Sequence, residues 1–233
     1  MSLVDKQYRV DLKTFRQVIP LTYIALVNQT VDQYIDINHM KPCFNYRDTD
    51  GFMSFHFGLW KRQSNPLKLS GDLRRPRCQA HERLTRQLLT DFTPLFEYLR
   101  GLFRNHFPDV YQQYCNVQID PCPGDDELEK PWFQTRPFWP WCCMTLTSCE
   151  PEKGQLKFHS DRNEDLDGLA TIVVFGHHTD GGEVVLAKHQ TVISCPVGTV
   201  YMIRGVELHA VNKCIGGRRY SLILFTDRYI LEM

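Results

Sequence analysis

The sequence predicts an α+β fold in which a double-stranded β-helix, or jelly-roll, core carries N-terminal helices packed on it. Three observations predict this fold. Apolar residues recur at helical spacing in the first half of the chain. After Trp141 the pattern changes to short apolar segments separated by turns. The 233 residues are 42% hydrophobic and 23% charged, which is enough apolar material to form a core without a disulfide or metal staple.

Residues 1–117 are expected to form a mixed, largely helical N-terminal part. The segment Thr22–Tyr34 is apolar enough for a helix, although its β-branched residues leave a strand open as the alternative. Phe52–Leu59 alternates loosely between apolar and other residues, which favours a strand.

A long helix is predicted between residues 80 and 107. Its apolar positions recur every three or four residues, at Leu84, Leu88, Phe92, Leu95, Leu99, Leu102 and Phe103. Pro94 and Gly101 lie inside this pattern, and we expect them to kink or divide the helix.

Residues 118–141 are expected to be an irregular connection, because they contain five prolines and the acidic run 125–127. Tryptophans at 132, 139 and 141 suggest that this connection packs against the rest of the protein. The jelly-roll core is then predicted over residues 142–233, in one compact domain overall.

Turn sequences rich in Gly, Asp and Pro separate eight short predicted strands in this last region. They are Cys142–Ser148, Leu156–His159, Leu169–Gly176, Glu183–Ala187, Thr191–Cys195, Thr199–Ile203, His209–Asn212 and Tyr220–Thr226. Eight short strands at this spacing are typical of a double-sheet jelly roll or a small barrel.

Two His-x-Asp motifs lie on this pattern, at His159-Ser-Asp161 and His178-Thr-Asp180, and a further histidine, His209, begins a late strand. Iron(II) oxygenases commonly bind the metal through two histidines and one carboxylate on one face. The second motif lies in a Gly-rich turn, where Asp serves turn formation. Four predicted strands separate the first motif from His209, so that their ends can meet. We therefore predict a metal site at His159, Asp161 and His209; the alternative is that His209 is an ordinary buried histidine.

Arg219 and Ser221 lie on a strand that otherwise looks buried. A buried arginine requires an anionic partner, and guanidinium binds a carboxylate in bidentate fashion. Ser221 faces the same side of the strand and can donate another hydrogen bond. The alternative is that Arg219 lies at the surface of an edge strand.

The His159-x-Asp161 motif, His209, Arg219 and Ser221 follow one another in this order. With these four elements in place, residues 154–228 resemble the catalytic core of the 2-oxoglutarate/iron(II) dioxygenases. His159-Ser-Asp-Arg-Asn163, Gly181-Gly-Glu-Val-Val-Leu and Arg219-Tyr-Ser-Leu-Ile-Leu-Phe-Thr226 most resemble the TET/JBP branch, the fungal TET-like members above all. The match covers about the last third of the chain. That branch oxidises the methyl group of 5-methylcytosine or thymine in DNA.

This resemblance implies Fe(II) and 2-oxoglutarate as cofactors, dioxygen as co-reactant and ascorbate as reductant. It implies that Arg219 and Ser221 hold the distal carboxylate of 2-oxoglutarate. A flipped-out base would stack on Phe225, with polar contacts from Asn163, Glu164 and Asp227. The alternatives are a core position for Phe225 and solvated loops for the other three. At Asp227 the sequence departs from the polar residue that the family carries.

Basic residues are concentrated between residues 61 and 86, at Lys61, Arg62, Lys68, Arg74, Arg75, Arg77, Arg83 and Arg86. Such a segment can follow a phosphate backbone, so Arg74, Arg75 and Arg77 are predicted to contact DNA. The alternative is a solvated surface balanced by the acidic stretch at 120–129, since the formal net charge of the chain is zero.

Three classes of function remain open at this point. The first is a nucleic-acid base dioxygenase, the second a 2-oxoglutarate-dependent hydroxylase of a protein side chain or small molecule, and the third a non-catalytic jelly-roll binding module. The start of the chain has no apolar signal segment and no apolar run is long enough to span a membrane. The nine cysteines include no CxxC pair. We therefore expect reduced thiols, no membrane partner and an intracellular location, nuclear or cytoplasmic.

Overall fold

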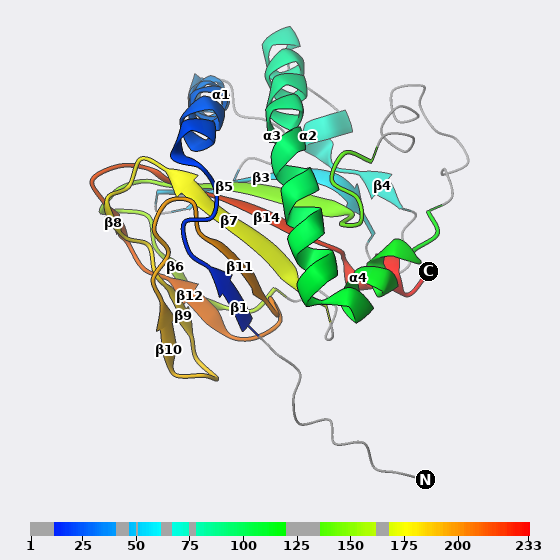
Figure 1. Ribbon diagram of the computed structural model, residues 1–233. Helices are drawn as coiled ribbons and strands as arrows, with labels where there is room; N and C mark the ends of the chain where they lie inside the picture. The colour runs from blue at the N-terminus through cyan, green and yellow to red at the C-terminus, as the bar shows by residue number, and fades with distance from the viewer. Residues whose placement is uncertain are drawn as a thin grey trace.

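Two β-sheets face one another, and long helices pack on the outer side of the larger sheet (Figure 1). The computed structural model describes residues 12–40, 47–49, 51–61, 67–74, 78–119, 136–161 and 168–233.

The main sheet has the strand order β1-β11-β7-β14-β5-β3-β2, with β4 paired to β3. Every pairing in it is antiparallel. In that order its strands are β1 (Leu12–Phe15), β11 (Val200–Ile203), β7 (Ala170–Gly176), β14 (Arg219–Phe225), β5 (Cys143–Cys149), β3 (Phe52–Trp60), β2 (Arg47–Thr49) and β4 (Lys68–Leu69).

The small sheet has the order β10-β9-β12-β6, and a two-stranded ribbon pairs β13 with β8. The strands of the small sheet are β10 (Thr191–Ile193), β9 (Val184–Leu186), β12 (His209–Val211) and β6 (Leu156–His159); those of the ribbon are β13 (Cys214–Ile215) and β8 (Asp180–Gly181). Two facing antiparallel sheets built from these strands form the predicted jelly roll.

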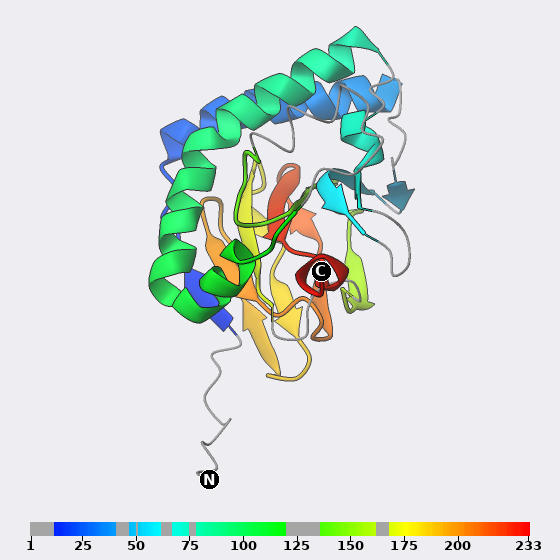
Figure 2. The same cartoon turned by 90° about the vertical axis from the view of Figure 1, so that its right-hand side faces the viewer.

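The helices described in the structure are α1 (Leu21–Met40), α2 (Gly71–Arg74), α3 (Gln79–His106), α4 (Pro108–Cys115) and α6 (Arg228–Leu231). Helix α1 is held on the main sheet by Asn28, whose Nδ2 donates to the carbonyl oxygen of Gly176 at 2.9 Å. Helices α1 and α3 run along one side of the sheets in Figure 2. Within the described residues, no helix combines the length and the apolar character needed to cross a membrane.

Helix α3 decides between the two outcomes that the sequence left open, a kink or a division at Pro94 and Gly101. It continues without interruption through Pro94 and Gly101, so neither residue divides it. Figure 2 shows that the helix bends along its length, as expected for a helix that contains proline. Its buried side chains, which include Leu84, Leu88 and Phe92, recur at the predicted spacing and pack on the main sheet.

Successive side chains along each strand of the main sheet point to opposite faces, so the protein has two cores. One lies between the main sheet and the helices, and the second lies between the two sheets. On β14, Tyr220, Leu222 and Leu224 belong to the core between the main sheet and the helices. Neighbouring positions on the strand point to the other face, towards the small sheet, because side chains alternate along a strand. Arg219 and Ser221 therefore lie on the face between the two sheets, which we call the inner face.

Each of the eight strands predicted after Trp141 appears in the structure, with ends shifted by up to two residues. The strand predicted at Phe52–Leu59 appears as β3. It pairs along its length with β5, from Phe52 opposite Cys149 to Gly58 opposite Cys143. The main sheet therefore includes strands from both halves of the sequence.

Candidate metal centre and anion pocket

Three potential metal ligands gather at one end of the small sheet. His159 is the last residue of β6 and His209 the first residue of β12, and the two lie directly opposite each other in the pairing of these strands. Asp161 follows two residues after His159, where its backbone N–H donates to the carbonyl oxygen of Gly205 at 2.8 Å. The ligand atoms of the three side chains all lie within 4.8 Å of one another.

The carboxylate of Asp161 lies between the two imidazoles. Its Oδ1 is 3.7 Å from Nε2 of His159, and its Oδ2 is 3.8 Å from Nε2 of His209. The ring centroids of the two histidines are 4.3 Å apart. Two imidazoles and one carboxylate that converge in this way form the donor set that non-haem iron(II) oxygenases use, with the remaining metal positions left open.

Backbone carbonyls orient both imidazole rings. Nδ1 of His159 is 2.9 Å from the carbonyl oxygen of Lys157, and Nδ1 of His209 is 2.7 Å from that of Glu207. A carbonyl can only accept, so each Nδ1 carries the proton and each Nε2 keeps its lone pair for a metal. Burial lowers the pKa of His209, which further favours the neutral ring.

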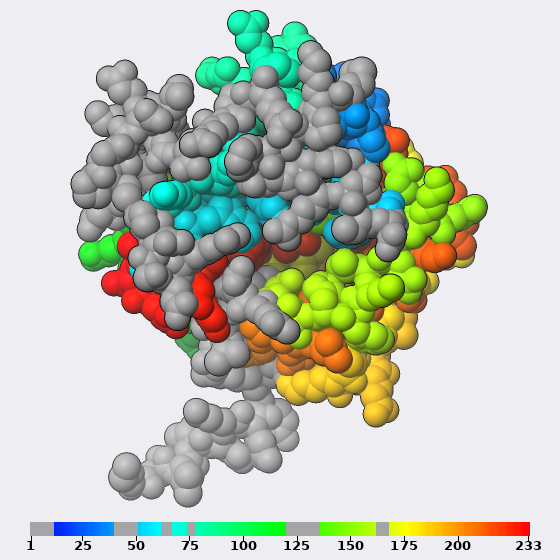
Figure 3. All heavy atoms as spheres, turned by 180° about the vertical axis from the view of Figure 1, so that it is seen from behind, coloured from blue at the N-terminus to red at the C-terminus, as the bar shows by residue number. Residues whose placement is uncertain are grey.

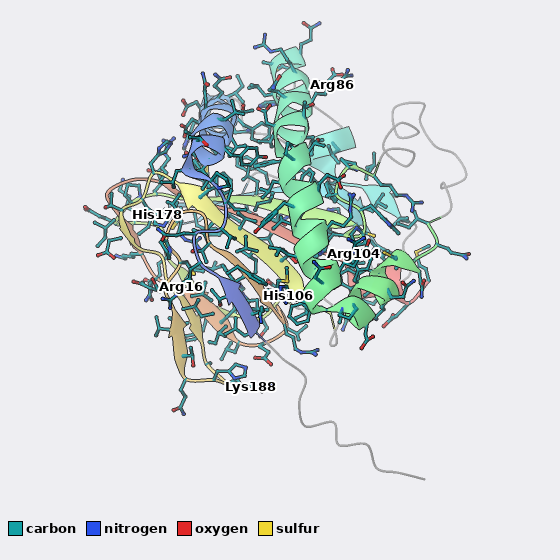
Figure 4. The ribbon with its side chains drawn as sticks, viewed as in Figure 1. Arg16, Arg86, Arg104, His106, His178 and Lys188 are labelled. Atoms are coloured by element: carbon teal, nitrogen blue, oxygen red, sulfur yellow. The ribbon has the colours of Figure 1, made fainter. Side chains whose placement is uncertain are left out.

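The rival motif does not form a comparable site among the described residues. His178 is buried with Nε2 3.3 Å from the carbonyl oxygen of Cys195, whereas Asp180 is exposed in β8 and accepts from the N–H of Gly181. Figure 4 shows His178 beside the end of β7. The choice of the first motif therefore agrees with the geometry, but the strand count behind it was wrong. Five strands, including the two-residue β8, separate β6 from β12, and direct pairing of β6 with β12 brings the ligands together.

Arg219 lies on the inner face of β14 and is 2% exposed. Its Nη1 donates to Oγ of Ser221 at 2.5 Å, while Nε and Nη2 are buried and have no hydrogen-bond acceptor within normal geometry among the residues that the structure describes. The hydroxyl of Tyr201 and the thiol of Cys195 lie close to the guanidinium, and burial raises the pKa of both, so that both are neutral. No carboxylate of the described residues forms an ion pair with Arg219. A buried cation without a counter-ion is strongly unfavourable, so the surroundings of Arg219 are suited to an anionic ligand.

Gly182 makes room for the arginine side chain. A Cβ atom at this position would lie 2.5 Å from Cδ and 2.8 Å from Nε of Arg219, and the backbone φ is +69°. Any L-residue here would therefore be strained and would also displace the guanidinium. Sequence reasoning interpreted Gly181-Gly182 as turn chemistry, and only the close approach of the folded chain reveals this second role.

We expect Gly182→Ala to weaken binding of a dicarboxylate by at least about tenfold while leaving metal binding intact, because it moves Arg219 and not the histidines. Calorimetric titration with 2-oxoglutarate, with bound iron measured in parallel, checks this. Gly101→Ala is the matched control: a Cβ there meets nothing within 4 Å, and Gly101 lies within α3. That variant should bind as the wild type does and gain about 0.5–1 kcal/mol in the free energy of unfolding. Unchanged 2-oxoglutarate affinity in Gly182→Ala would contradict this role.

The structure places some of the predicted substrate residues and leaves others outside the described residues. Phe225 lies on the inner face of β14 and is 7% exposed. Its ring contacts that of Trp60 edge to face, with ring centroids 5.6 Å apart. Asp227 is 1% exposed and caps α6, since its Oδ1 accepts from the N–H of Tyr229 at 2.9 Å. Burial raises the pKa of Asp227 to about 6. Its other oxygen, Oδ2, is buried and has no hydrogen-bond partner in the described part of the chain.

The structure does not describe the side chains of the other residues predicted to contact substrate or DNA. Asn163 and Glu164, like Arg75 and Arg77, lie outside the described residues. Arg74 ends helix α2, but its side chain is not described.

Comparison with known proteins agrees with the fold. No protein-family model and no curated protein matches the sequence. Among solved structures, NgTET1 in complex with 5mC DNA has a TM-score of 0.67 at 16% identity, over 94% of this chain and 72% of that one. The viral collagen prolyl hydroxylase vCPH from Paramecium Bursaria Chlorella virus-1, as its 2OG complex, has a TM-score of 0.49 at 8% identity, over 92% and 94% of the two chains. A Pseudomonas putida prolyl-4-hydroxylase has a TM-score of 0.49 at 13% identity, over 94% and 93%.

The likeness to NgTET1 extends over nearly the whole chain, whereas the sequence resemblance covered only its last third. The predicted jelly-roll fold is confirmed, and it is similar to the fold of NgTET1.

Proposed function

We propose that this protein is a 2-oxoglutarate- and Fe(II)-dependent dioxygenase that oxidises the methyl group of 5-methylcytosine, or of another methylated base, in DNA. One observation carries the enzyme class: His159, Asp161 and His209 converge in a structure that also buries Arg219, which has no carboxylate partner among the described residues. A metal site alone has many uses. A metal site combined with a buried pocket for a carboxylate fits a metal-chelating dicarboxylic acid.

His159, Asp161 and His209 would hold the iron, which when bound supplies the activation of dioxygen and the oxidation of the substrate. Arg219 would bind the distal carboxylate of 2-oxoglutarate with Nε and Nη2, and Ser221 would hold Nη1 in place. Buried apolar side chains of the second core, among them Val174 and Leu186, exclude water from the interior between the sheets. This exclusion strengthens the electrostatic interactions of the pocket.

Two features support a base in DNA as the substrate. NgTET1 has a similar fold, and its structure was solved in complex with 5mC DNA, which makes a methylated base the first substrate to test. Phe225 lies on the same strand face as Arg219 and Ser221 and offers an aromatic surface beside Trp60. An enzyme that acts on a base must flip it out of the duplex, and aromatic side chains then stack on it.

The proposal is tested by incubating the protein with methylated DNA, Fe(II), ascorbate and 2-oxoglutarate, followed by mass spectrometry of the nucleosides and measurement of succinate. We expect 5-hydroxymethylcytosine together with succinate. Succinate without any modified base would favour the second candidate, a hydroxylase of a protein side chain or small molecule. A protein that retains no iron and shows no thermal shift with 2-oxoglutarate would instead be a jelly-roll binding module.

Replacing Arg74, Arg75 and Arg77 with alanine tests the proposed contact with the DNA backbone. We expect weaker DNA binding and a shallower dependence of log K on log salt, by about 0.9 for each lost phosphate contact. Fluorescence anisotropy at several salt concentrations measures both. Arg104→Ala is the control, because Arg104 is exposed near the end of α3 (Figure 4) and outside the basic segment. An unchanged salt slope in the triple variant would remove this segment from the DNA interface.

A further inference from the structure

The connection between β11 and β12, residues 204–208, supports two of the three candidate metal ligands through its backbone. The carbonyl oxygen of Glu207 lies 2.7 Å from Nδ1 of His209. The carbonyl oxygen of Gly205 accepts from the backbone N–H of Asp161 at 2.8 Å. The placement of this connection therefore determines how the side chain of His209 and the backbone of Asp161 are held.

Two kinds of backbone hydrogen bond shape the connection. The N–H of Glu207 donates to the carbonyl oxygen of Arg204 at 3.1 Å, which closes a turn over residues 204–207. The carbonyl oxygen of Leu208 accepts from the N–H of Ala187 at 3.0 Å, directly after the end of β9. The β9–β10 hairpin is therefore the neighbour against which the connection is positioned.

This hairpin also contacts the connection through two side chains. Nζ of Lys188 is 2.7 Å from Oε1 of Glu207, and Nε2 of His189 is 3.2 Å from Oε2. Both side chains belong to the turn at residues 187–190, and Figure 4 shows Lys188 at the free end of the hairpin. Figure 3 shows the golden atoms of the hairpin beside the orange atoms that follow β11. Each oxygen of one carboxylate thus faces a different residue of the turn, a contact that we call the Glu207 clasp.

The Glu207 clasp has a local effect. The side chain of Glu207 is only 14% exposed, whereas that of Lys188 is 60% exposed. A partly exposed ion pair of this kind contributes little to the free energy of unfolding. The same glutamate, however, carries the carbonyl oxygen that faces Nδ1 of His209. A shift of its backbone therefore moves a contact that orients a metal ligand, and such outer-shell contacts strongly affect metal affinity.

We propose that Glu207 is a positioning residue of the metal centre, held by Lys188 and His189 so that its carbonyl oxygen fixes the ring of His209. The inference rests on the proposed function, since it requires a metal at this site, and it deepens it. While the carbonyl oxygen accepts from Nδ1–H, Nε2 of His209 keeps its lone pair for the metal. Without the clasp, the ring can rotate and change its tautomer.

His159 provides an internal reference for this proposal. Its Nδ1 faces the carbonyl oxygen of Lys157, which belongs to β6 and not to the connection at 204–208. Loss of the clasp should therefore change the ring of His209 and leave that of His159 as it is. A general loosening of the fold would change both rings.

The test compares Glu207→Ala and Glu207→Gln with the wild type, in the full chain. Anaerobic competition with a chromogenic chelator measures the affinity for Fe(II), and nitrogen NMR of the metal-free, histidine-labelled protein reports the tautomer of each ring. Spectra of His159→Gln and His209→Gln assign the two signals. We expect Glu207→Ala to lower Fe(II) affinity by about 10- to 100-fold, with His209 in mixed tautomers and His159 unchanged. Glu207→Gln keeps a side-chain oxygen but loses the charge, so it should show a smaller loss of the same kind.

Glu97→Gln is the matched control, because it breaks an ion pair of the same length elsewhere. Oε2 of Glu97 is 2.7 Å from Nη1 of Arg100, and both residues lie on α3 in the helix layer. This control should keep the wild-type Fe(II) affinity and both histidine tautomers. Lys188→Met should add no further loss to Glu207→Ala, because the two substitutions act through the same contact.

The inference is wrong if Glu207→Ala and Glu207→Gln keep the wild-type Fe(II) affinity and the wild-type tautomer of His209. It is also wrong if His159 and His209 change their tautomers together, since that result indicates a structural role. A wild-type protein that binds no Fe(II), or whose Fe(II) is retained by Asp161→Ala, would overturn the proposed function itself, and this inference with it.

Discussion

Asp161→Ala should remove bound iron and lower succinate formation by more than about 100-fold, since disturbing even an outer-shell partner of a metal ligand costs 10- to 100-fold. The reason is geometric: one oxygen of Asp161 faces each histidine Nε2, at 3.7 and 3.8 Å. Loss of this carboxylate leaves two neutral imidazoles and no anionic ligand. Iron retained after desalting, measured per chain, and succinate yield test the prediction.

Asp180→Ala is the matched control for this experiment, because it alters the acid of the other His-x-Asp motif. Asp180 is exposed, and its carboxylate accepts only a local hydrogen bond from Gly181 among those described. We expect the control to keep wild-type iron content. Iron retained by Asp161→Ala, or lost by Asp180→Ala, would show that the metal site has been assigned to the wrong motif.

Arg219→Met should weaken 2-oxoglutarate binding by about 2–5 kcal/mol, which corresponds to about 30- to 5,000-fold in affinity. Removing one partner of a buried, hydrogen-bonded ion pair leaves the other charge unpaired, and here the carboxylate of 2-oxoglutarate would be that charge. Calorimetric titration of the iron-loaded protein measures the change. Arg218→Met is the control, because Arg218 forms partly exposed ion pairs with Asp36 and Glu150. Such pairs contribute about 0–1 kcal/mol to stability, so 2-oxoglutarate affinity should not change.

The same substitution should have the opposite effect on stability when no ligand is present. In the free protein Arg219 is a buried cation without a described counter-ion, and methionine removes that unfavourable charge while filling similar space. Arg219→Met should therefore unfold at an equal or higher temperature than the wild type without 2-oxoglutarate, and lose the stabilisation that 2-oxoglutarate gives the wild type. A large drop in melting temperature without ligand would instead indicate that Arg219 supports the fold through contacts within the protein.

Much of the core was predictable because local patterns dominate it. Strand alternation and turn residues predicted β7 and β14 within one or two residues, and the helical spacing of Leu84 to Phe103 predicted α3. The convergence of His159, Asp161 and His209 was predictable in part, because two of these residues are close in sequence and the third begins a strand. The pairing of β6 with β12, which actually joins them, is a long-range contact that no local pattern contains.

Features that depend on long-range contacts could not be predicted from the sequence. The pairing of β3 with β5, which adds His56 to the inner face, joins residues about ninety positions apart. Gly182 looks like any turn glycine until Arg219 is packed against it. Asp227 occupies a position where the resembling family carries a substrate contact, although the residue type departs from that family. Its Oδ1 caps α6, a role that the short length of that helix hid. A substrate role for Asp227 remains a proposal.

The central claim is that one site binds iron through His159, Asp161 and His209 and 2-oxoglutarate through Arg219. Anaerobic calorimetric titration with 2-oxoglutarate, of the metal-free and the iron(II)-loaded protein side by side, tests it most directly. We predict one 2-oxoglutarate per chain in the iron-loaded protein and clearly weaker binding without iron, because the metal and the arginine hold opposite ends of the same molecule. Equal affinity with and without iron, or no binding in either state, would contradict it.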